Sequence, residues 1–210
     1  MTAILPDVNA PMMLELCAGF GGQSQPFLEA GYDVLRIDNN PLLGSVEKMV
    51  IADVFDLEVF NLSSNCIDYI HAGPTCLEFS LAFNAPRAVA IRNGEGNSYY
   101  PHNGVKLVKR VKEIIDTLKP RYWSIENVHG AQKYLNEILG EPRLIVGPYI
   151  FWGNFPLFEF DAATLPNKSV NGDKYRRDPL RMNYRAKMPH SLAKAFLTAM
   201  RQQKTLKDFP

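Results

Sequence analysis

The chain has 210 residues, of which 46% are hydrophobic and 21% are charged, and its net charge at pH 7 is +1. This length suits a single domain with a substantial core, and the composition is ordinary for a soluble globular protein. The balanced charge excludes a globally basic nucleic-acid coat, but it is compatible with a local basic patch. Three cysteines without a CxxC or a His/Cys cluster predict neither a disulfide framework nor a zinc site.

Apolar runs separated by turn signals predict an α/β succession of short strands and helices. The first unit is a strand at residues 12–17, a glycine turn at 18–22, a helix at 23–30 and a strand at 32–37, which is the scale of one βαβ unit. The further expected elements are strands at 49–52, 66–70 and 121–128, one or two strands within 144–155, and helices at 105–118, 131–139 and 189–203.

Two segments are not assigned to regular elements. Residues 85–103 are rich in Gly, Asn, Arg and Tyr, and we expect a mobile loop that covers the substrate. Residues 161–181 have turn signals without periodicity. The N-terminus lacks the features of a signal peptide and no apolar run is long enough to span a bilayer, so the expected location is cytoplasmic or nucleoid-associated, neither secreted nor in a membrane.

The glycine turn and two strand-end acids predict a cofactor site. Glycine lets the backbone approach a cofactor closely, and the N-terminus of the next helix is expected to offer free N–H groups. Asp38 ends the second strand, where it can accept hydrogen bonds from ribose hydroxyls. Asp53 ends the third strand, where it can bond the amine of an adenine, although a helix N-cap for residues 54–60 explains it equally well.

The spacing of this site favours S-adenosylmethionine over a dinucleotide. The turn reads Ala-Gly-Phe-Gly-Gly, which differs from G-x-G-x-x-G, and Asp38 lies 16 residues beyond Gly22. A structural strand–helix turn is the alternative interpretation. The predicted cofactor contacts are Ala18, Gly19, Phe20, Gly21, Gly22, Asp38 and Asp53.

A single cysteine, Cys76, follows the Gly73-Pro74 turn after the fourth strand. Open α/β sheets place their chemistry in loops at the carboxyl ends of strands, which favours a nucleophile over a buried structural thiol. Glu126 ends the fifth strand in the same way, followed by Asn127. Because parallel strands end at one edge of a sheet, we expect the cofactor turn, Cys76 and Glu126 to lie close together.

A thiolate and a carboxyl group beside a methyl donor predict methyl transfer to C5 of a pyrimidine. That carbon is not nucleophilic in the free base, and addition of a thiolate at C6 makes it enamine-like. A carboxyl group that hydrogen-bonds N3 and the exocyclic amine stabilises the charge that develops.

Three stretches resemble motifs of the DNA (cytosine-5)-methyltransferase family: Leu-Cys-Ala-Gly-Phe-Gly-Gly at 16–22, Ala-Gly-Pro-Thr-Cys-Leu-Glu-Phe-Ser at 72–80, and Glu-Asn-Val at 126–128. The resemblance covers residues 12–135. It implies a Rossmann-like, doubly wound α/β fold with a mostly parallel sheet of the S-adenosylmethionine-dependent methyltransferase type, in one domain over residues 1–210. It also implies Cys76 as the nucleophile, Glu126 as the ring-activating group, Pro74 as a further cofactor contact, and DNA as the substrate.

The chain departs from that family in several places, including its closing helix, which lacks the Gly-Asn of the family's final motif. Thr75 stands where the family has proline, and the family's Gln-x-Arg-x-Arg strand is not visible. Residues 159–187 form a reduced, irregular and basic segment in place of a target-recognition region. The candidate substrate contacts are Ser80, Arg87, Asn127, Arg176 and Arg177, with Glu78 and Ser80 also expected to order their loop.

Two alternatives to a DNA-modifying enzyme stay open. The same chemistry could act on RNA, single-stranded DNA or a free nucleotide, because sequence readout looks minimal. A catalytically degenerate methyltransferase-like subunit would instead need a separate DNA-recognition partner.

Overall fold

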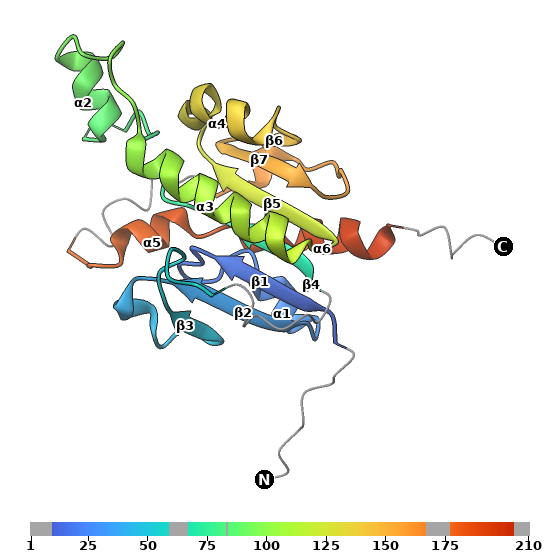
Figure 1. The fold of residues 1–210 in the computed structure, drawn as a ribbon. Helices are drawn as coiled ribbons and strands as arrows, with labels where there is room; N and C mark the ends of the chain where they lie inside the picture. Colours follow the sequence, from blue (N-terminus) through green and yellow to red (C-terminus); the bar gives the residue numbers. More distant parts are fainter. Residues whose placement is uncertain (1–9, 59–66, 83, 167–176, 204–210) are drawn as a thin grey trace.

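The computed structural model describes residues 10–58, 67–82, 84–166 and 177–203. Within these residues the backbone forms a seven-stranded sheet with helices on both faces (Figure 1). The strands are β1 (Met12–Leu16), β2 (Asp33–Asp38), β3 (Met49–Ile51), β4 (Ile67–Ala72), β5 (Tyr122–Asn127), β6 (Leu144–Val146) and β7 (Tyr149–Asn154). Their order across the sheet is β3-β2-β1-β4-β5-β7-β6.

The sheet is parallel from β3 to β5, and β7 is antiparallel to both of its neighbours. The chain builds outwards from β1 towards one edge and from β4 towards the other, which is the doubly wound arrangement. The predicted Rossmann-like, mostly parallel α/β fold is therefore confirmed. Ligands of such sheets bind at the carboxyl ends of the two strands where the order reverses, and here these strands are β1 and β4.

Helices cover both faces of the sheet and enclose two apolar cores. The helices are α1 (Gln25–Glu29), α2 (Pro86–Arg92), α3 (His102–Leu118), α4 (Gln132–Leu139), α5 (Arg181–Ala186) and α6 (His190–Gln202). The core beneath α3 and α4 contains Val108, Leu135 and Trp152. The core on the opposite face joins Phe27 of α1 to Phe196 of α6. In Figure 1, α3 crosses in front of the sheet and α6 lies behind it.

The sequence of α3 explains both its packing and its end. Its apolar residues recur at helical spacing and are buried against the sheet: Val105, Val108, Val111, Ile114 and Ile115. The helix stops where Lys119 adopts a left-handed conformation with φ 49°, immediately before Pro120.

The structure corrects the expectation of one long loop at residues 85–103. This stretch contains α2, and α3 begins at His102 rather than at residue 105. Figure 1 shows α2 standing away from the sheet beyond the start of α3. The signal that sequence reasoning passed over was Pro86, because proline at the first position of a helix is favourable. The buried residues of α2 are the small Ala88 and Ala90, which give no strong apolar periodicity.

Other boundaries shift by a few residues. The helix expected at 23–30 is only the five-residue α1, and residues 54–56 form a turn rather than the start of a helix. Residues 161–181 contain a short 3₁₀ helix at Ala162–Thr164, and α5 begins at Arg181. Cys66, residues 59–60 and Arg176 lie outside the described residues. The domain prediction for residues 1–210, including the basic segment at 159–187, stays a prediction.

Among the described residues, none of the helices is both long and apolar enough to cross a membrane.

Candidate functional site

The glycine turn after β1 combines one open position with two crowded ones. Gly19 and Gly21 have φ of +53° and +66°, a conformation that favours glycine. A Cβ at Gly21 would overlap the guanidinium of Arg36, and one at Gly22 would lie 2.6 Å from the Met188 nitrogen. Packing within the protein thus requires glycine at positions 21 and 22, which agrees with the alternative interpretation of this segment as a structural strand–helix turn. Gly19, the residue of this turn with space around it, is the better candidate for close approach by a cofactor.

The N-terminus of α1 does not offer the free N–H groups expected from the sequence. The buried carboxylate of Glu15 accepts hydrogen bonds from the backbone nitrogens of Gln23 (3.2 Å) and Ser24 (3.0 Å). Burial raises the pKa of Glu15, while hydrogen bonds to Ser24 and the nearby Arg36 oppose that rise. Because an internal carboxylate already takes these donors, the turn is poorly suited to cradle a phosphate.

Asp38 and Asp53 end neighbouring strands, as predicted. Asp38 accepts from the backbone nitrogens of Gly19 (2.8 Å) and Asn40 (2.9 Å), so it ties the glycine turn to the end of β2. Asp53 accepts from Phe55 N (2.9 Å) and from Asn39 Nδ2 (3.2 Å), which closes a turn rather than capping a helix. Both carboxylates retain lone pairs for further donors.

The charge at this edge is negative. Burial raises the pKa of the Cys17 thiol to about 12, and the charges of Asp38 and Asp53 add to that rise. Cys17 therefore stays protonated and unreactive. The same negative potential disfavours a pyrophosphate and suits a ligand with cationic groups.

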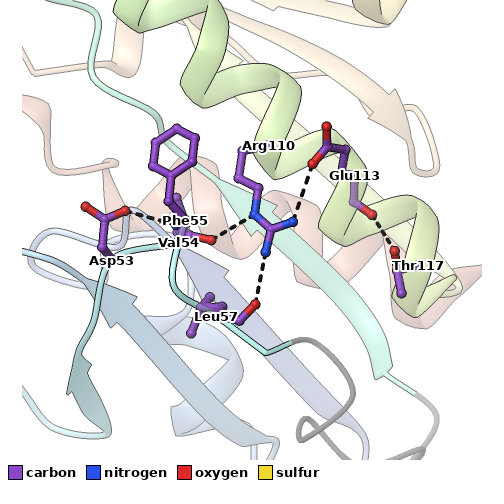
Figure 2. A network of polar contacts seen from close by, with 7 residues as sticks. All are labelled: Asp53, Val54, Phe55, Leu57, Arg110, Glu113 and Thr117. Atoms are coloured by element: carbon purple, nitrogen blue, oxygen red, sulfur yellow. Dashed lines mark hydrogen bonds and ion pairs between the residues drawn. The ribbon is translucent and has the colours of Figure 1, made fainter.

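Arg110 of α3 holds the loop that carries Asp53. Its Nε donates to Val54 O (3.0 Å), its Nη2 donates to Leu57 O (2.9 Å), and its Nη1 lies 3.4 Å from Glu113 Oε2. Figure 2 shows the guanidinium between the loop carbonyls and Glu113, with Asp53 bonded to Phe55 on the far side of the loop. Sequence reasoning did not find this contact, because Arg110 and Val54 are separated by 56 residues.

The thiol loop, residues 74–80, begins directly beside the glycine turn. Gly73 N donates to Leu16 O (3.2 Å), which joins the ends of β4 and β1. Cys76 is half-buried, and its carbonyl accepts from Phe79 N (3.0 Å) and Ser80 N (2.9 Å), so the nucleophile candidate starts a helical turn.

Asn127 joins the thiol loop to the end of β5. Its Nδ2 donates to Pro74 O (3.0 Å), its Oδ1 accepts from Val128 N (2.9 Å), and the residue is 1% exposed. This arrangement favours a positioning role over the substrate contact predicted for Asn127. It also places buried Pro74, a predicted cofactor contact, between the two strand ends.

Glu78 orders the loop, as expected. Its carboxylate accepts from Asn103 Nδ2 (3.0 Å) and Gly104 N (2.8 Å) in the first turn of α3. Ser80 Oγ accepts from Ala82 N (3.0 Å). The substrate contact of Ser80 stays a prediction beside this local role.

Arg87 has main-chain and aromatic partners within the protein. Its Nη1 donates to Phe79 O (3.3 Å) and to Gly130 O (2.6 Å), and its Cζ lies 5.4 Å from the centroid of the Tyr134 ring. The described guanidinium therefore binds the protein's own main chain through Nη1, and the substrate contact of Arg87 stays a prediction.

Glu126 lies at the carboxyl end of β5, half-buried and paired in register with Phe151 of β7. Burial raises the pKa of Tyr149, and the charge of Glu126 adds to the rise. The carboxylate thus lies near the Tyr149 phenol, at the same edge of the sheet as the thiol loop.

A buried polar network underlies these strand ends. Ser124 Oγ lies 2.6 Å from the Tyr69 hydroxyl and 2.7 Å from His71 Nδ1, and Gln23 Nε2 donates to the Tyr69 hydroxyl (3.1 Å). Burial lowers the pKa of His71 to about 3, so the ring is neutral, as expected of a satisfied core histidine. The network links β4 and β5 to Gln23, which lies between the glycine turn and α1. Its sequence signal was the presence of polar residues within apolar strands.

Helix α5 packs over the glycine turn, which sequence reasoning missed. The rings of Phe20 and Tyr184 have centroids 4.5 Å apart, and Asn40 Nδ2 donates to Asn183 Oδ1 (3.5 Å). Arg177 is exposed just before this helix, and its substrate contact stays a prediction, as does that of Arg176 outside the described residues.

No family model and no curated protein matches the sequence. Several solved structures do match it. A prophage-encoded E. coli protein assigned as a DNA modification methyltransferase is 20% identical, with a TM-score of 0.47, over 69% of this chain and 47% of its own. The Entamoeba histolytica methyltransferase EhMeth is 14% identical, with a TM-score of 0.48, over 73% of this chain and 55% of its own.

The S. pombe Dnmt2 methyltransferase is 16% identical, with a TM-score of 0.41, over 68% of this chain and 48% of its own. The chain thus spans about half the length of these three structures. At such identities and scores a functional argument has to come from the residues of the site.

Proposed function

We propose that the chain is an S-adenosylmethionine-dependent methyltransferase that methylates C5 of cytosine in DNA through a covalent bond between Cys76 and C6. The observation that carries this proposal is the direct hydrogen bonding among three strand ends. Gly73 N to Leu16 O joins the thiol loop to the cofactor turn, and Asn127 Nδ2 to Pro74 O joins it to the strand of Glu126.

The cofactor site fits S-adenosylmethionine better than a dinucleotide. Glu15 occupies the amides of Gln23 and Ser24 just before α1, which a phosphate would need, and the acids Asp38 and Asp53 make this edge negative. S-adenosylmethionine carries a sulfonium and an ammonium but no phosphate, and when bound it supplies an electrophilic methyl group. At Gly19 the protein backbone would approach the cofactor closely. Asp38 would accept hydrogen bonds from the ribose hydroxyls, and Asp53 would accept one from the adenine amine.

The residues of the chain supply the activation of the base. The Cys76 thiolate forms a bond to C6, and the displaced electron pair makes C5 nucleophilic. The Glu126 carboxyl group hydrogen-bonds N3 and the exocyclic amine, which stabilises the charge that develops on the ring. After methylation, loss of the C5 proton to a base and cleavage of the S–C6 bond regenerate the aromatic ring and the thiolate.

A methyl-transfer assay tests this proposal. The protein is incubated with methyl-labelled S-adenosylmethionine and, separately, with duplex DNA, single-stranded DNA, RNA and dCMP, and each reaction is repeated with Cys76→Ser. We expect label in duplex DNA with the wild type and none with Cys76→Ser. Cys17→Ser is the matched control and should retain transfer, because burial and the nearby acids raise the pKa of this half-buried thiol to about 12 and keep it protonated.

Each other result would reject a stated part of the proposal. Label in RNA or dCMP but in neither form of DNA would support the methyl-transfer chemistry and reject DNA as the substrate. Label in single-stranded DNA alone would reject the duplex. Transfer that survives Cys76→Ser would reject the covalent mechanism. Binding of DNA or cofactor without transfer to any substrate would favour a non-catalytic subunit that acts with a separate recognition partner.

A further inference from the structure

A guanidinium that the proposed chemistry does not use lies against the thiol loop. Arg87, in the first turn of α2, uses one nitrogen, Nη1, to donate to Phe79 O at 3.3 Å and to Gly130 O at 2.6 Å. Phe79 belongs to the loop after β4, and Gly130 lies in the 3₁₀ helix His129–Ala131 after β5. One charged group therefore bridges the main chain beyond the two strands that carry Cys76 and Glu126.

Glycine makes this bridge possible. A Cβ at Gly130 would overlap Phe79 O and lie 2.7 Å from Arg87 Nη1. On the other side of Phe79, a Cβ at Gly104 would lie 2.8 Å from the phenyl ring. Phe79 itself is 0% exposed. The backbone at Gly130 and at Gly104 thus packs closely against Phe79 on two sides. The guanidinium of Arg87 adds hydrogen bonds to the Phe79 and Gly130 carbonyls.

The turn that Arg87 holds is the turn that carries the nucleophile. Cys76 O accepts from Phe79 N, so main-chain bonds connect the cysteine to the residue that the guanidinium fixes. On the other side of Cys76, Pro74 O is held by Asn127 Nδ2. Thr75 lies between Pro74 and Phe79, whose carbonyls are held in this way, and it lacks the ring by which a proline would fix φ. The contacts of Asn127 and Arg87 therefore restrain the loop where the local sequence does not.

We infer that Arg87 is a positioning residue, which fixes the Cys76 thiol relative to Glu126 by bridging the Phe79 and Gly130 carbonyls. The catalytic part of this inference rests on the proposed function. The restraint on the loop does not, because it can be measured without any methyl transfer.

Two variants break the bridge in different ways. Arg87→Ala removes the guanidinium, and Gly130→Ala inserts a methyl group between the bridged segments without changing any charge. The rate of Cys76 alkylation by iodoacetamide, followed by mass spectrometry of its peptide, should rise several-fold in both. Arg87→Lys should give an intermediate rate, because an ammonium cannot reproduce the planar geometry of a guanidinium. Arg92→Ala, which removes the same charge from the last turn of α2, should keep the wild-type rate.

The kinetic readout separates positioning from general loss of structure. A displaced thiol should lower kcat by roughly 10- to 100-fold, since misplacement of reacting groups by about 1 Å has effects of this size. The Kd for S-adenosylmethionine should stay within about twofold of the wild type, because the other predicted cofactor residues lie on other strand ends and Asn127 still holds Pro74 O in both variants.

The possible results distinguish this inference from the proposed function. Unchanged alkylation in folded Arg87→Ala and Gly130→Ala would overturn the inference, as would parallel losses of kcat and cofactor affinity. A wild type that transfers no methyl group, with alkylation that still responds to both variants, would overturn the proposed function alone. If Arg87→Ala does not fold, Arg87→Lys and Gly130→Ala provide the same test.

Discussion

Carboxylates around the candidate site bind backbone N–H groups of the protein and thereby hold its loops together. Glu15 binds the start of α1, Asp38 binds the glycine turn, and Glu78 binds the start of α3, each through backbone N–H groups. Charge-assisted bonds of this kind are stronger than those between neutral groups. The acids therefore fix the backbone around the candidate site before any ligand binds.

His71 gives this buried region a testable dependence on pH. The unfolded chain binds the imidazole proton near pH 6.5, whereas burial lowers the folded pKa to about 3. Protons therefore favour the unfolded state, and the free energy of unfolding falls as the pH drops from 6.5 towards 3. Between pH 7 and pH 5, His71 should account for a loss of about 2 kcal/mol in the free energy of unfolding.

The check is chemical denaturation of the wild type and His71→Gln at pH 7 and pH 5. The variant lacks this titrating group, so its stability should fall less over the same interval, although its stability at pH 7 is expected to be lower because the Ser124 contact changes. Equal pH dependence of the two proteins would contradict a neutral, buried His71.

The positions of the residues proposed to carry chemistry were easier to predict than the positions of the residues that hold their loops. Cys76, Glu126 and Asp38 follow apolar strand runs, so their position at one edge follows from strand periodicity and parallel pairing. Arg87 and Asn127 were predicted as substrate contacts, but they bind the main chain of Gly130 and Pro74. Such partners are 43 and 53 residues away in sequence, and they become visible only when the loops are packed together.

Among the elements, α3 connects the two halves of the candidate site. Gly104 N in its first turn donates a hydrogen bond to Glu78 of the thiol loop. Arg110 in its middle donates to the main chain of the loop that carries Asp53 (Figure 2). The helix has 17 residues and buries its apolar stripe on the sheet, so it is a rigid support for both loops.

Loss of Arg110 should therefore affect cofactor binding more than chemistry. Arg110→Ala removes two hydrogen bonds to the loop of Asp53, each worth about 1 kcal/mol, and should weaken S-adenosylmethionine binding by about 5- to 10-fold. Calorimetric titration measures the Kd, with Lys109→Ala on the exposed side of α3 as the control. An unchanged Kd in Arg110→Ala would show that this contact does not order the cofactor site.

Element prediction succeeded where apolar periodicity was strong and failed where packing used small residues. The stripe of α3 and the apolar runs of the strands were found from the sequence with small boundary errors. Helix α2 was missed because it buries only Ala88 and Ala90, and the six-residue α5 buries no residue fully. The contact of α5 with the glycine turn through Phe20 and Tyr184 had no local signal.

For the whole molecule, the reversal of strand order between β1 and β4 explains the location of the site. The chain leaves these neighbouring strands towards opposite edges of the sheet, so their carboxyl-end loops face a common space. One loop is the glycine turn and the other carries Cys76, while β5 adds Glu126 from the adjacent strand. The topology thus brings together groups that lie 50 or more residues apart in sequence.

Attack of Cys76 on C6 of a cytosine is tested most directly by covalent trapping. Fluorine at C5 cannot leave as a proton does, so a methylated adduct should persist. Duplex DNA that contains 5-fluorocytosine is incubated with the protein and S-adenosylmethionine, and the denatured products are analysed by mass spectrometry. We expect a stable DNA adduct on the Cys76 peptide with the wild type, also with Cys17→Ser, and none with Cys76→Ser. Absence of the adduct in the wild type, or an adduct that persists in Cys76→Ser, would contradict the account.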